Sequence, residues 1–456
     1  MNSSVNKTKN KELNISLRKN SFDVISSCYN EDEATLEADR CLLCKKPTCI
    51  DGCPVHINIP QFLKYVRERN FKDAYFLLSN FTCMPDICGS ICPHEKQCAG
   101  NCIRSKVGDG VNIGEIERFV AEYAFKNKLE KTIKKDVNKS IAVIGSGPSS
   151  LSFALTMAKF GYSITIFEKE SHLGGLLYSG VPSFRLDKKY LDRFVDKLLS
   201  YNVKINFNCE IGKTIKLDKI ISSFDGVYIG IGSNKQNCLQ NVDIDGKNVV
   251  FAGDFLRCLS EKPIDKYGKK TYQTCGENVV IVGGGNTAMD SARNALRLEQ
   301  VKSVKIVYRR TEKEMPACLS ELKDAKEEGV EFLELTNPYK FNFKDGKLES
   351  VECALMELSE PDDSGRRKPV ESSKPHITLR ADTVILALGS SNCVDFLKGT
   401  NIKVDERNAI IVDENNKTSL NKVYAGGDIT TGTLTVVEAM KSGINAAKAM
   451  DKELNK

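Results

Sequence analysis

Ten of the chain's 17 cysteines lie in its first 102 residues, and their spacing is typical of ligands for a soft metal. The first group reads C-x2-C-x4-C-x3-C-P, and the second reads C-x3-C-P-x4-C-x3-C. The cysteines of the two groups are Cys41, Cys44, Cys49 and Cys53, then Cys88, Cys92, Cys98 and Cys102. In a reducing compartment they stay thiols, and thiolates at such spacing collect soft metals. This array therefore predicts a metal centre near the start of the chain.

Two observations favour iron–sulfur clusters over zinc. Structural zinc sites take about four ligands from paired short spacings, whereas eight or nine candidate ligands crowd together here. Cys49, Cys53 and Pro54 also reproduce the C-x3-C-P ending of the bacterial ferredoxin pattern, although the spacing before it is four residues rather than two. We therefore expect two iron–sulfur clusters, with zinc as the alternative.

The expected location disfavours disulfides. Residues 1–20 are polar and lysine-rich and lack the apolar core of a signal peptide. No run of about 18 apolar residues could span a membrane. We expect a cytoplasmic protein whose cysteines face reducing surroundings. The net charge of +6 is spread over lysines along the chain, which indicates a solvated surface rather than a nucleic-acid site.

Glu117 lies on the apolar face of a predicted helix over residues 114–126. Apolar side chains occupy the neighbouring helical positions, at Ile113, Val120, Ala121 and Ala124. A carboxylate without a partner is costly in such a place. A salt bridge to a basic residue and ligation of a cluster iron are the two solutions, and the sequence leaves both open.

A first stretch after the cysteines reads as strand, glycine-rich turn, helix and strand, which is the βαβ unit that binds dinucleotides. A strand at 141–144 leads into the turn at Gly145 to Ser150, a helix runs to about residue 160, and a strand follows at 164–168. The glycines let the backbone approach a pyrophosphate, which then lies at the helix N-terminus. Glu168 closes the second strand, where its carboxylate can accept ribose hydroxyls.

A second βαβ unit follows the same order but ends in basic residues. Its strand at 279–282 precedes a turn at Gly283, a helix runs to about residue 298, and the next strand covers 304–310. That strand ends at Arg309 and Arg310, and two neighbouring guanidiniums can bind a 2′-phosphate. This ending favours NADP(H) over NAD(H), and a solvated basic strand end is the alternative.

Two dinucleotide sites in one chain predict a bound flavin and an exchanging nicotinamide, with hydride passing between them. Asp428 supports the flavin, because an acid after Ala425-Gly426-Gly427 at a strand end can hold ribityl hydroxyls. The similar Ala252-Gly253-Asp254 is expected to be a loop. Strands at 384–389 and 422–428 are expected to return to the first dinucleotide domain, and a final helix to run from 433 to 452 directly after Asp428.

With 456 residues the chain should hold two or three domains. The predicted fold class is α/β, with a helical iron–sulfur domain followed by two Rossmann-like domains, the second inserted into the first. The expected ranges are a flexible tail at 1–20, an iron–sulfur domain at 21–137, an FAD-binding domain at 138–275 and 376–456, and an NAD(P)H-binding domain at 276–375.

These motifs resemble a known family over about residues 22–450. Its members include the small subunit of bacterial glutamate synthase, the large subunit of NADH-dependent ferredoxin:NADP oxidoreductase (the electron-bifurcating transhydrogenase) and the N-terminal half of dihydropyrimidine dehydrogenase. The shared marks are E-A-D-R-C-L-L-C at 37–44, G-C-P-V at 52–55, I-C-P at 91–93, I-G-E-I-E-R-F at 113–119, G-G-L-L at 174–177, F-R-L at 184–186, the turn at 283–290, Y-R-R at 308–310 and A-G-G-D at 425–428.

The resemblance implies two interleaved [4Fe–4S] clusters, FAD and NADPH. One cluster would be held by Cys41, Cys44, Cys49 and Cys102, and the other by Cys53, Cys92, Cys98 and Glu117. Cys88 matches a family cysteine that is not a ligand. The FAD would be bound by Gly145, Gly147, Pro148, Ser149, Glu168, Gly175, Leu176, Gly427, Asp428, Thr435 and Val436. The NADPH would be bound by Gly283, Gly284, Gly285, Asn286, Thr287, Arg309 and Arg310.

Three departures from the family pattern leave every predicted ligand in place. Ser150 replaces a Gly or Ala, Ser179 replaces a Gly in the loop expected near the flavin ring, and the stretch at 232–234 lacks a proline. We name no acid–base residue, because the hydride chemistry belongs to the flavin.

Within the family, the stretches at 356–358 and 361–367 look more like the transhydrogenase large subunit, with the glutamate synthase small subunit as the alternative. Both interpretations imply a partner chain, because the N-terminus carries no recognisable amidotransferase nucleophile. The partner would be a small flavin and [2Fe–2S] chain or a large glutamate synthase chain, with ferredoxin as a further candidate. A redox- or metal-sensing dinucleotide-binding protein is the alternative from another class.

Overall fold

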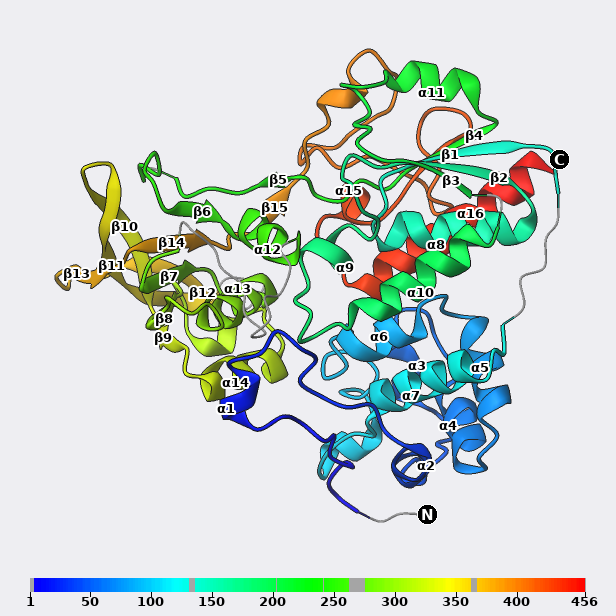
Figure 1. Ribbon diagram of the computed structural model, residues 1–456, viewed down its shortest axis with the longest axis horizontal. Coiled ribbons are helices and arrows are strands. Elements are labelled where there is room, and N and C mark those ends of the chain that lie inside the picture. Colours follow the sequence, from blue (N-terminus) through cyan, green and yellow to red (C-terminus); the bar gives the residue numbers. More distant parts are fainter. Residues whose placement is uncertain are drawn as a thin grey trace.

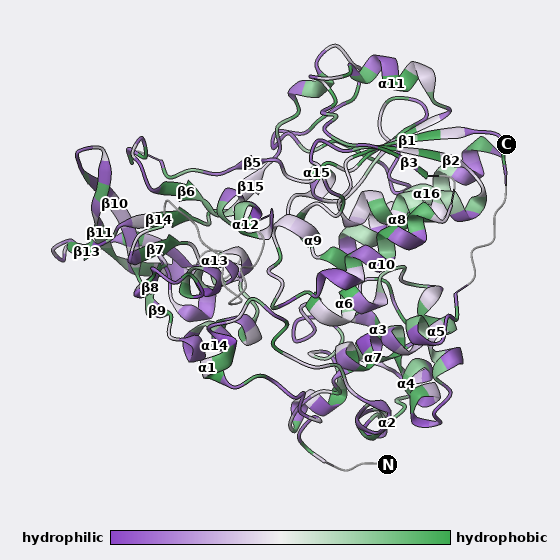
Figure 2. Ribbon diagram, in the orientation of Figure 1, coloured by the Kyte–Doolittle hydropathy of each residue, from purple (hydrophilic) through white to green (hydrophobic). Residues whose placement is uncertain are grey.

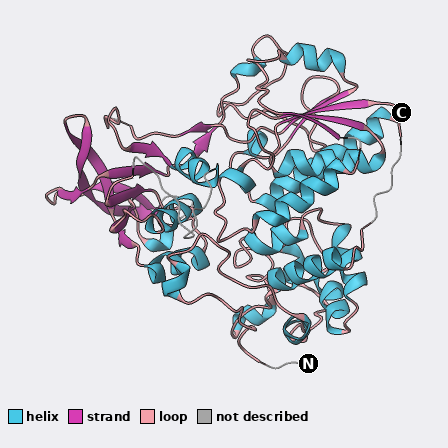
Figure 3. Ribbon diagram, in the orientation of Figure 1, coloured by secondary structure: helices cyan, strands magenta, loops and turns pink. Residues whose placement is uncertain are grey.

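The computed structural model describes residues 4–130, 136–201, 203–240, 242–261, 275–361 and 367–455. Figure 1 shows a helical N-terminal part below a first α/β domain, with a second α/β domain beside both. Figure 3 shows that the N-terminal part consists of helices and loops, whereas the strands gather in the other two parts. Within the described residues, no helix combines the length and the apolar character needed to cross a membrane.

The N-terminal domain packs short helices around the cysteine loops. They are α2 (Glu31–Ala38), α3 (Thr48–Asp51), α4 (Ile59–Arg67), α5 (Phe71–Ser79), α6 (Pro85–Ile91) and α7 (Ile113–Lys126). Local sequence signals account for the starts of two of these helices. Asn30 and Glu33 form a capping box at α2, and Pro60 lies in the first turn of α4, where no N–H is required.

The first α/β domain is a five-stranded parallel sheet in the order β16-β4-β1-β2-β3. Its strands are β1 (Ser140–Ile144), β2 (Ser163–Phe167), β3 (Val203–Asn206), β4 (Gly226–Ile229) and β16 (Val423–Ala425). Its helices are α8 (Pro148–Phe160), α9 (Leu176–Ser179), α10 (Lys188–Leu199), α11 (Leu217–Ser223), α15 (Asp428–Thr431) and α16 (Val436–Leu454). Polar and apolar residues alternate along α11, which buries Leu217 and Ile220 in the core of this domain (Figure 2).

Helices α8 and α16 cross closely on one face of the first sheet, and Gly443 makes this approach possible. A Cβ at Gly443 would lie 2.1 Å from the Ser149 carbonyl oxygen. The final helix thereby meets the glycine-rich turn at the start of α8. It begins later than expected, at Val436, because the short helix α15 and its loop separate it from Asp428.

The second α/β domain is a five-stranded parallel sheet in the order β6-β14-β7-β8-β9, nested in the chain between β4 and β16. Its strands are β6 (Val249–Phe251), β7 (Asn278–Val282), β8 (Ser303–Val307), β9 (Glu331–Leu333) and β14 (Thr383–Leu386). Its helices are α12 (Ala252–Glu261), α13 (Asn286–Leu296) and α14 (Leu319–Glu328). The expected insertion of one dinucleotide domain into the other is confirmed, but the expected bounds of 276–375 are too narrow, because β6 before them and β14 after them belong to the second sheet.

Two expectations about this region are wrong. The strand predicted at 384–389 does not return to the first sheet, because β14 pairs with β6 and β7. Its four residues are all buried, and an apolar run of this kind fits the centre of either parallel sheet, so composition could not assign it. Ala252-Gly253-Asp254 is the first turn of α12 and not a loop.

The stretch after β9 forms an antiparallel sheet. Its strands are β10 (Thr336–Lys344), β11 (Lys347–Pro361), β12 (Arg367–Glu371) and β13 (Ile377–Arg380). Where the chain passes between the two α/β domains, β5 (Lys235–Gln236) pairs with β15 (Ser390–Ser391). Of the stretch at 361–367 that suggested the transhydrogenase, residues 362–366 lie outside the described residues.

The segment expected as a free N-terminal tail is packed against the second α/β domain. In Figure 1 it runs in dark blue from the helical domain to α14, where α1 (Ile15–Arg18) lies. Arg18 is only 1% exposed, and Phe22 joins the hydrophobic core formed by α12, α13 and the second sheet. Polarity predicted a tail, but the charges of Arg18 are neutralised by acidic residues far away in the sequence.

Candidate cluster and dinucleotide sites

Four cysteines line a first cavity in the helical domain. They are Cys41, Cys44, Cys49 and Cys102, the four residues that the family resemblance assigns to one cluster. Aliphatic side chains, including Leu63, complete the wall. In the described parts of the chain, no three His, Cys, Asp or Glu side chains gather closely enough to hold a single metal ion.

A second cavity lies beside the first. It is lined by the four residues expected for the other cluster, Cys53, Cys92, Cys98 and Glu117. Its wall also contains Cys88, Thr82, His94, Gln97 and Val437, none of which was predicted to contribute to a cluster. The donor sets of both cavities fit iron–sulfur clusters, whose ligands are chiefly thiolates.

The two cavities are neighbours because their ligands alternate along the chain. Cys49 on α3 lines the first cavity, and Cys53, in the turn that follows α3, lines the second. Further along the chain, Cys98 lines the second cavity and Cys102 lines the first. Gly52 permits this crowding, since a Cβ there would lie 2.8 Å from the carbonyl oxygen of Gln97.

Burial disfavours the thiolates as long as no cluster neutralises them. It raises the pKa of Cys49 to about 12 and raises the pKa of Cys41, Cys53 and Cys98. A hydrogen bond with the Cys88 side chain, followed by burial, raises the pKa of Cys92. A metal must therefore displace these protons when it binds.

Among the residues that the structure describes, Glu117 makes no salt bridge that would explain its burial. Its side chain is 6% exposed, and in the part of the chain that the structure describes its Oε1 finds no hydrogen-bond partner. Burial, followed by the negative charge of Cys88, raises the pKa of Glu117 well above its usual range. A buried carboxylate facing a thiol-lined cavity has the character of a metal ligand rather than of a structural ion pair.

The first glycine-rich turn leaves space for a pyrophosphate at the start of α8. A Cβ on Gly147 would meet no atom within 4 Å, whereas Gly145, at φ 91°, lies against the Gly230 carbonyl oxygen. Pro148 and Ser149 open α8, whose N-terminus favours an anion. Gly175, at φ 52°, closes the turn over Gly147.

Glu168 is held in place directly after β2. Its carboxylate accepts hydrogen bonds from the Ser146 hydroxyl at 2.5 Å and from the Glu170 amide at 2.9 Å. Leu176, the first residue of α9, is 61% exposed on the far side of Gly175. The turn, the acid and α9 are therefore the elements that we expect to bind the first dinucleotide.

Asp428 and the start of α16 connect these elements to the second cavity. Asp428 begins α15 and accepts a hydrogen bond from the Leu434 amide at 3.0 Å, and burial raises its pKa to about 6. Gly427, at φ 74°, adopts a backbone that only glycine adopts readily. Thr435 caps α16, and Gln97 of the helical domain donates to the Thr435 hydroxyl at 3.4 Å.

The departures at Ser150 and Ser179 are accommodated by hydrogen bonds. The Ser150 hydroxyl donates to the Gly230 carbonyl at 3.0 Å, and the Ser179 hydroxyl donates to the Gly175 carbonyl at 3.1 Å. Both serines therefore fit the first domain without an unsatisfied hydroxyl.

The second glycine-rich turn precedes α13. Gly283, at φ 143°, lies where a Cβ would approach the Ala387 carbonyl oxygen to 2.3 Å, and Gly284 lies against the Tyr308 ring. Gly285 caps α13, and Asn286 and Thr287 form its first turn. The turn therefore has the close packing that brings a backbone to a phosphate.

Arg309 and Arg310 follow β8, which ends at Val307 and is thus shorter than predicted. Arg309 is exposed, and Arg310 is half-buried. Among the described residues, the Arg310 Nε has no hydrogen-bond partner. The binding of a 2′-phosphate by these two guanidiniums stays a prediction.

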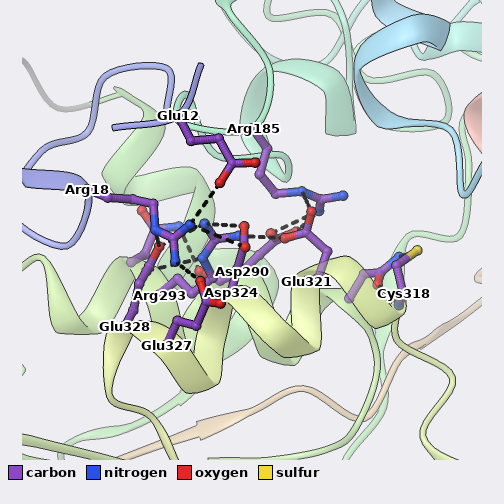
Figure 4. Close-up of polar contacts among 12 residues, drawn as sticks. Glu12, Arg18, Arg185, Asp290, Arg293, Cys318, Glu321, Asp324, Glu327 and Glu328 are labelled. Carbon is purple, nitrogen blue, oxygen red and sulfur yellow. Dashed lines mark hydrogen bonds and ion pairs between the residues drawn. The ribbon is translucent and has the colours of Figure 1, made fainter. Parts of the chain in front are cut away.

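Buried ion pairs join the second domain to the first. Arg185, from the F-R-L motif, contacts Asp290 of α13 at 2.8 Å and Glu321 of α14 at 2.8 Å. Figure 4 shows these residues together with Arg18 and Arg293, which reach the same face of α14. The network therefore joins α13 and α14 of the second domain to the segment between α9 and α10 of the first.

Sequence reasoning missed the parts of the site that depend on distant contacts. Lys96, between two expected cluster ligands, donates to the carbonyls of Pro316 at 2.8 Å and Ala317 at 3.1 Å. Ala317 in turn donates its amide to the Gly284 carbonyl at 3.2 Å. The position of Lys96 in the cysteine array was the only signal, and it did not indicate a partner.

Comparison with protein families gives two matches. Residues 18–129 match dihydropyrimidine dehydrogenase domain II, 4Fe-4S cluster. Residues 139–443, which are most of the chain, match pyridine nucleotide-disulphide oxidoreductase. The small chain of glutamate synthase [NADPH] from Escherichia coli (strain K12) is 33% identical over 448 residues, which are 95% of this chain and 94% of that protein. The chain belongs to the glutamate synthase small-chain family of pyridine nucleotide-disulphide oxidoreductases.

Other relatives place this small-chain family member among redox proteins. The putative oxidoreductase AegA of E. coli (strain K12) is 34% identical over 96% of this chain and 68% of its own length. NADP(+)-dependent formate dehydrogenase subunit beta of Moorella thermoacetica is 33% identical, over 89% of this chain and 60% of its own length. The family membership makes this chain a FAD/NAD(P)-dependent oxidoreductase with a 4Fe–4S domain.

Solved structures share the fold of the two α/β domains. Mycobacterium tuberculosis FprA in complex with NADPH aligns with a TM-score of 0.58 at 18% identity, over 70% of this chain and 85% of FprA. Thioredoxin reductase of T. acidophilum aligns with a TM-score of 0.52 at 21% identity, over 70% of this chain and 100% of the reductase. The predicted fold class is confirmed.

Proposed function

We propose that this chain is the NADPH-oxidising subunit of a larger oxidoreductase and passes electrons between NADPH, FAD and two [4Fe–4S] clusters. The ligand sets are those around the two cavities, with Glu117 as the eighth ligand. When bound, the FAD accepts hydride from the nicotinamide and exchanges single electrons with iron–sulfur clusters. The residues of this chain bind and orient these groups.

The observation that carries the proposal is the wall shared by the flavin site and the second cavity. Val437 lines that cavity, and it follows Thr435 and Val436, which are proposed to contact the flavin. The hydrogen bond from Gln97 to Thr435 joins the cysteine loop to the same helix start. The short stretch 435–437 thereby separates the flavin from the second cluster.

The first cavity is the proposed exit for electrons. Leu42 and Ile103 line it and are 42% and 40% exposed, although both are large apolar residues. Exposed apolar side chains at the edge of a redox site favour the docking of a partner protein. The cofactors would therefore follow the order NADPH, FAD, second cluster, first cluster, partner.

The identity of the partner is the second part of the proposal. The sequence motifs favoured a transhydrogenase, with a small flavin and [2Fe–2S] chain as partner. The relatives named as glutamate synthase small chains support a large glutamate synthase chain instead, because their length and this chain agree closely. Isolation of the native complex distinguishes the two, since the partners differ greatly in size and cofactors.

Anaerobic purification tests the cofactor assignment. We expect flavin absorption, about eight irons per chain and diaphorase activity with an artificial acceptor. Cys98→Ala should remove the second cluster and cluster-dependent electron transfer while leaving NADPH binding intact. Zinc in place of iron, or a preparation that binds no flavin, would contradict the proposal. A redox- or metal-sensing protein would bind the nucleotides but show negligible diaphorase activity.

A further inference from the structure

One loop of the helical domain contacts the second α/β domain directly. Lys96 lies in this loop, between Cys92 and Cys98, and donates to the carbonyl oxygens of Pro316 at 2.8 Å and Ala317 at 3.1 Å. A lysine ammonium has three donor hydrogens and no acceptor, so it can satisfy both carbonyls at once. The side chain of Lys96 therefore joins the helical domain to the segment that leads into α14.

Glu95, the residue before Lys96, caps the start of α14. Cys318 is the N-cap residue of α14 (Figure 4), but in the described part of the chain its side chain makes no capping hydrogen bond. The Glu95 carboxylate accepts a hydrogen bond from the Leu319 amide instead, and a carboxylate is favoured at the positive end of a helix. The helical domain thus holds residues 316–319, which we call the bridge segment, through two side chains.

The bridge segment lies against the glycine-rich turn that is expected to bind NADP(H). The Ala317 amide donates to the Gly284 carbonyl at 3.2 Å. The Cys318 amide donates to the side-chain oxygen of Asn286 at 2.8 Å. The bridge segment thereby fixes both a backbone carbonyl of the turn and the side chain of the first residue of α13.

The loop that carries Glu95 and Lys96 is held by its own backbone. The amides of Lys96 and Gln97 donate to the Pro93 carbonyl at 2.8 Å and 3.1 Å. These bonds involve no cysteine side chain, so the support of the bridge segment does not pass through a cluster ligand. This arrangement agrees with the retention of NADPH binding that is expected for Cys98→Ala.

We propose that Lys96 and Glu95 are positioning residues for NADP(H). The iron–sulfur domain holds the bridge segment against the second glycine-rich turn, and the bridge segment orients that turn for the nucleotide. Lys96 and Glu95 act through Ala317 and Cys318 rather than by contact with the nucleotide. The affinity for NADP(H) therefore depends on a loop outside both dinucleotide-binding motifs. This proposal rests on the proposed function, because it requires the second turn to bind NADP(H).

Calorimetric titration of the anaerobically purified holoprotein with 2′-phospho-ADP-ribose tests the positioning role. This probe has the 2′-phosphate and pyrophosphate of NADP(H) but no nicotinamide, so it binds without redox chemistry. Lys96 is exposed and its bonds compete with water, so Lys96→Met should weaken binding by only about 3- to 10-fold. Glu95→Ala should weaken it within the same range. Lys96→Arg, which keeps the charge and its donors, should bind more tightly than Lys96→Met.

Steady-state kinetics with an artificial acceptor provides a second measurement. In Lys96→Met the KM for NADPH should rise by the same factor as the dissociation constant of the probe, with little change in kcat. The variant should also keep its FAD and about eight irons per chain, which shows that it has folded. Lys72→Met, which removes an exposed lysine from α5 of the same domain, is the matched control and should bind the probe as the wild type does.

The outcomes separate this proposal from the proposed function. Wild-type affinity for the probe in Lys96→Met, an equal loss in Lys72→Met, or a loss that occurs only together with loss of FAD or iron would overturn the positioning role. A wild-type protein that does not bind the probe would instead overturn the proposed function.

Discussion

Arg18→Met should release the N-terminal segment from the second α/β domain. Arg18 is buried, and its guanidinium contacts Asp324 at 3.4 Å, Glu327 at 2.8 Å and Glu328 at 3.2 Å. Figure 4 shows these carboxylates along one face of α14. Methionine keeps the apolar part of the side chain and removes only the charge and its donors.

The expected loss of free energy depends on the ion pairs that the three carboxylates keep after Arg18 is replaced. Glu328 keeps its contacts with Arg293 at 2.9 Å and Arg297 at 2.6 Å, and Asp324 keeps Arg293 at 3.1 Å. No buried carboxylate is therefore left alone, and the loss stays below the roughly 3–5 kcal/mol of a broken buried pair. With hydrogen bonds to charged groups contributing about 1.5–3 kcal/mol, we expect the segment to open more easily by about 2–3 kcal/mol.

Hydrogen exchange of the α1 amides measures this opening. The amides of Arg18 and Lys19 donate to the carbonyls of Asn14 at 2.8 Å and Ile15 at 3.1 Å, and both bonds are lost when the segment detaches. Since each 1.4 kcal/mol is about tenfold, their protection should fall by about 30- to 150-fold. Lys19→Met, which removes an exposed charge from the same helix end, is the control. Equal protection in the two variants would refute the role assigned to the ion pairs.

Three further predictions concern the dinucleotide sites. Arg309→Ala combined with Arg310→Ala should raise the KM for NADPH by about 10- to 100-fold, because charge-assisted bonds to a 2′-phosphate are lost; an equal rise for NADH would exclude that role. FAD affinity should fall about tenfold per pH unit below pH 6, because Asp428, whose pKa burial raises to about 6, must lose its proton to accept ribityl hydroxyls; Asp428→Asn should bind FAD weakly and without this pH dependence, as followed by flavin fluorescence. Gly283→Ala should abolish NADP(H) binding but keep FAD, because its Cβ would lie 2.3 Å from a carbonyl oxygen at a φ of 143°; unchanged NADPH titrations would contradict the predicted turn.

Local sequence patterns were sufficient for the starts of α2 and α4, for α7 and for both βαβ units. The capping box at Asn30, the proline at 60 and the apolar runs before Gly145 and Gly283 act within a few residues, so their structures could be predicted without tertiary information. The apolar periodicity of α7 likewise placed Glu117 on a buried face. These signals are short-range, and they predicted the elements from which the sites are built.

The partners of each element depended on long-range contacts. The apolar run of β14 could fill either parallel sheet, and only its pairing with β6 and β7 assigned it to the second. Arg18 lies in a polar segment, and its burial depends on carboxylates about 300 residues away in the sequence. Polarity alone cannot reveal a buried ion pair, because the neutralising charges are supplied by packing.

The cysteine array also combines a short-range sequence signal with an arrangement that depends on long-range packing. Spacing alone predicted a soft-metal centre, and the family resemblance suggested how eight ligands divide between two clusters. The tertiary structure placed those residues around two adjacent cavities, put Cys88 in the second of them, and set Val437 of the last helix against it. Sequence spacing determines which thiols are available, whereas the packing of α6, α7 and α16 decides which of them share a cavity and which cofactor lies beside it.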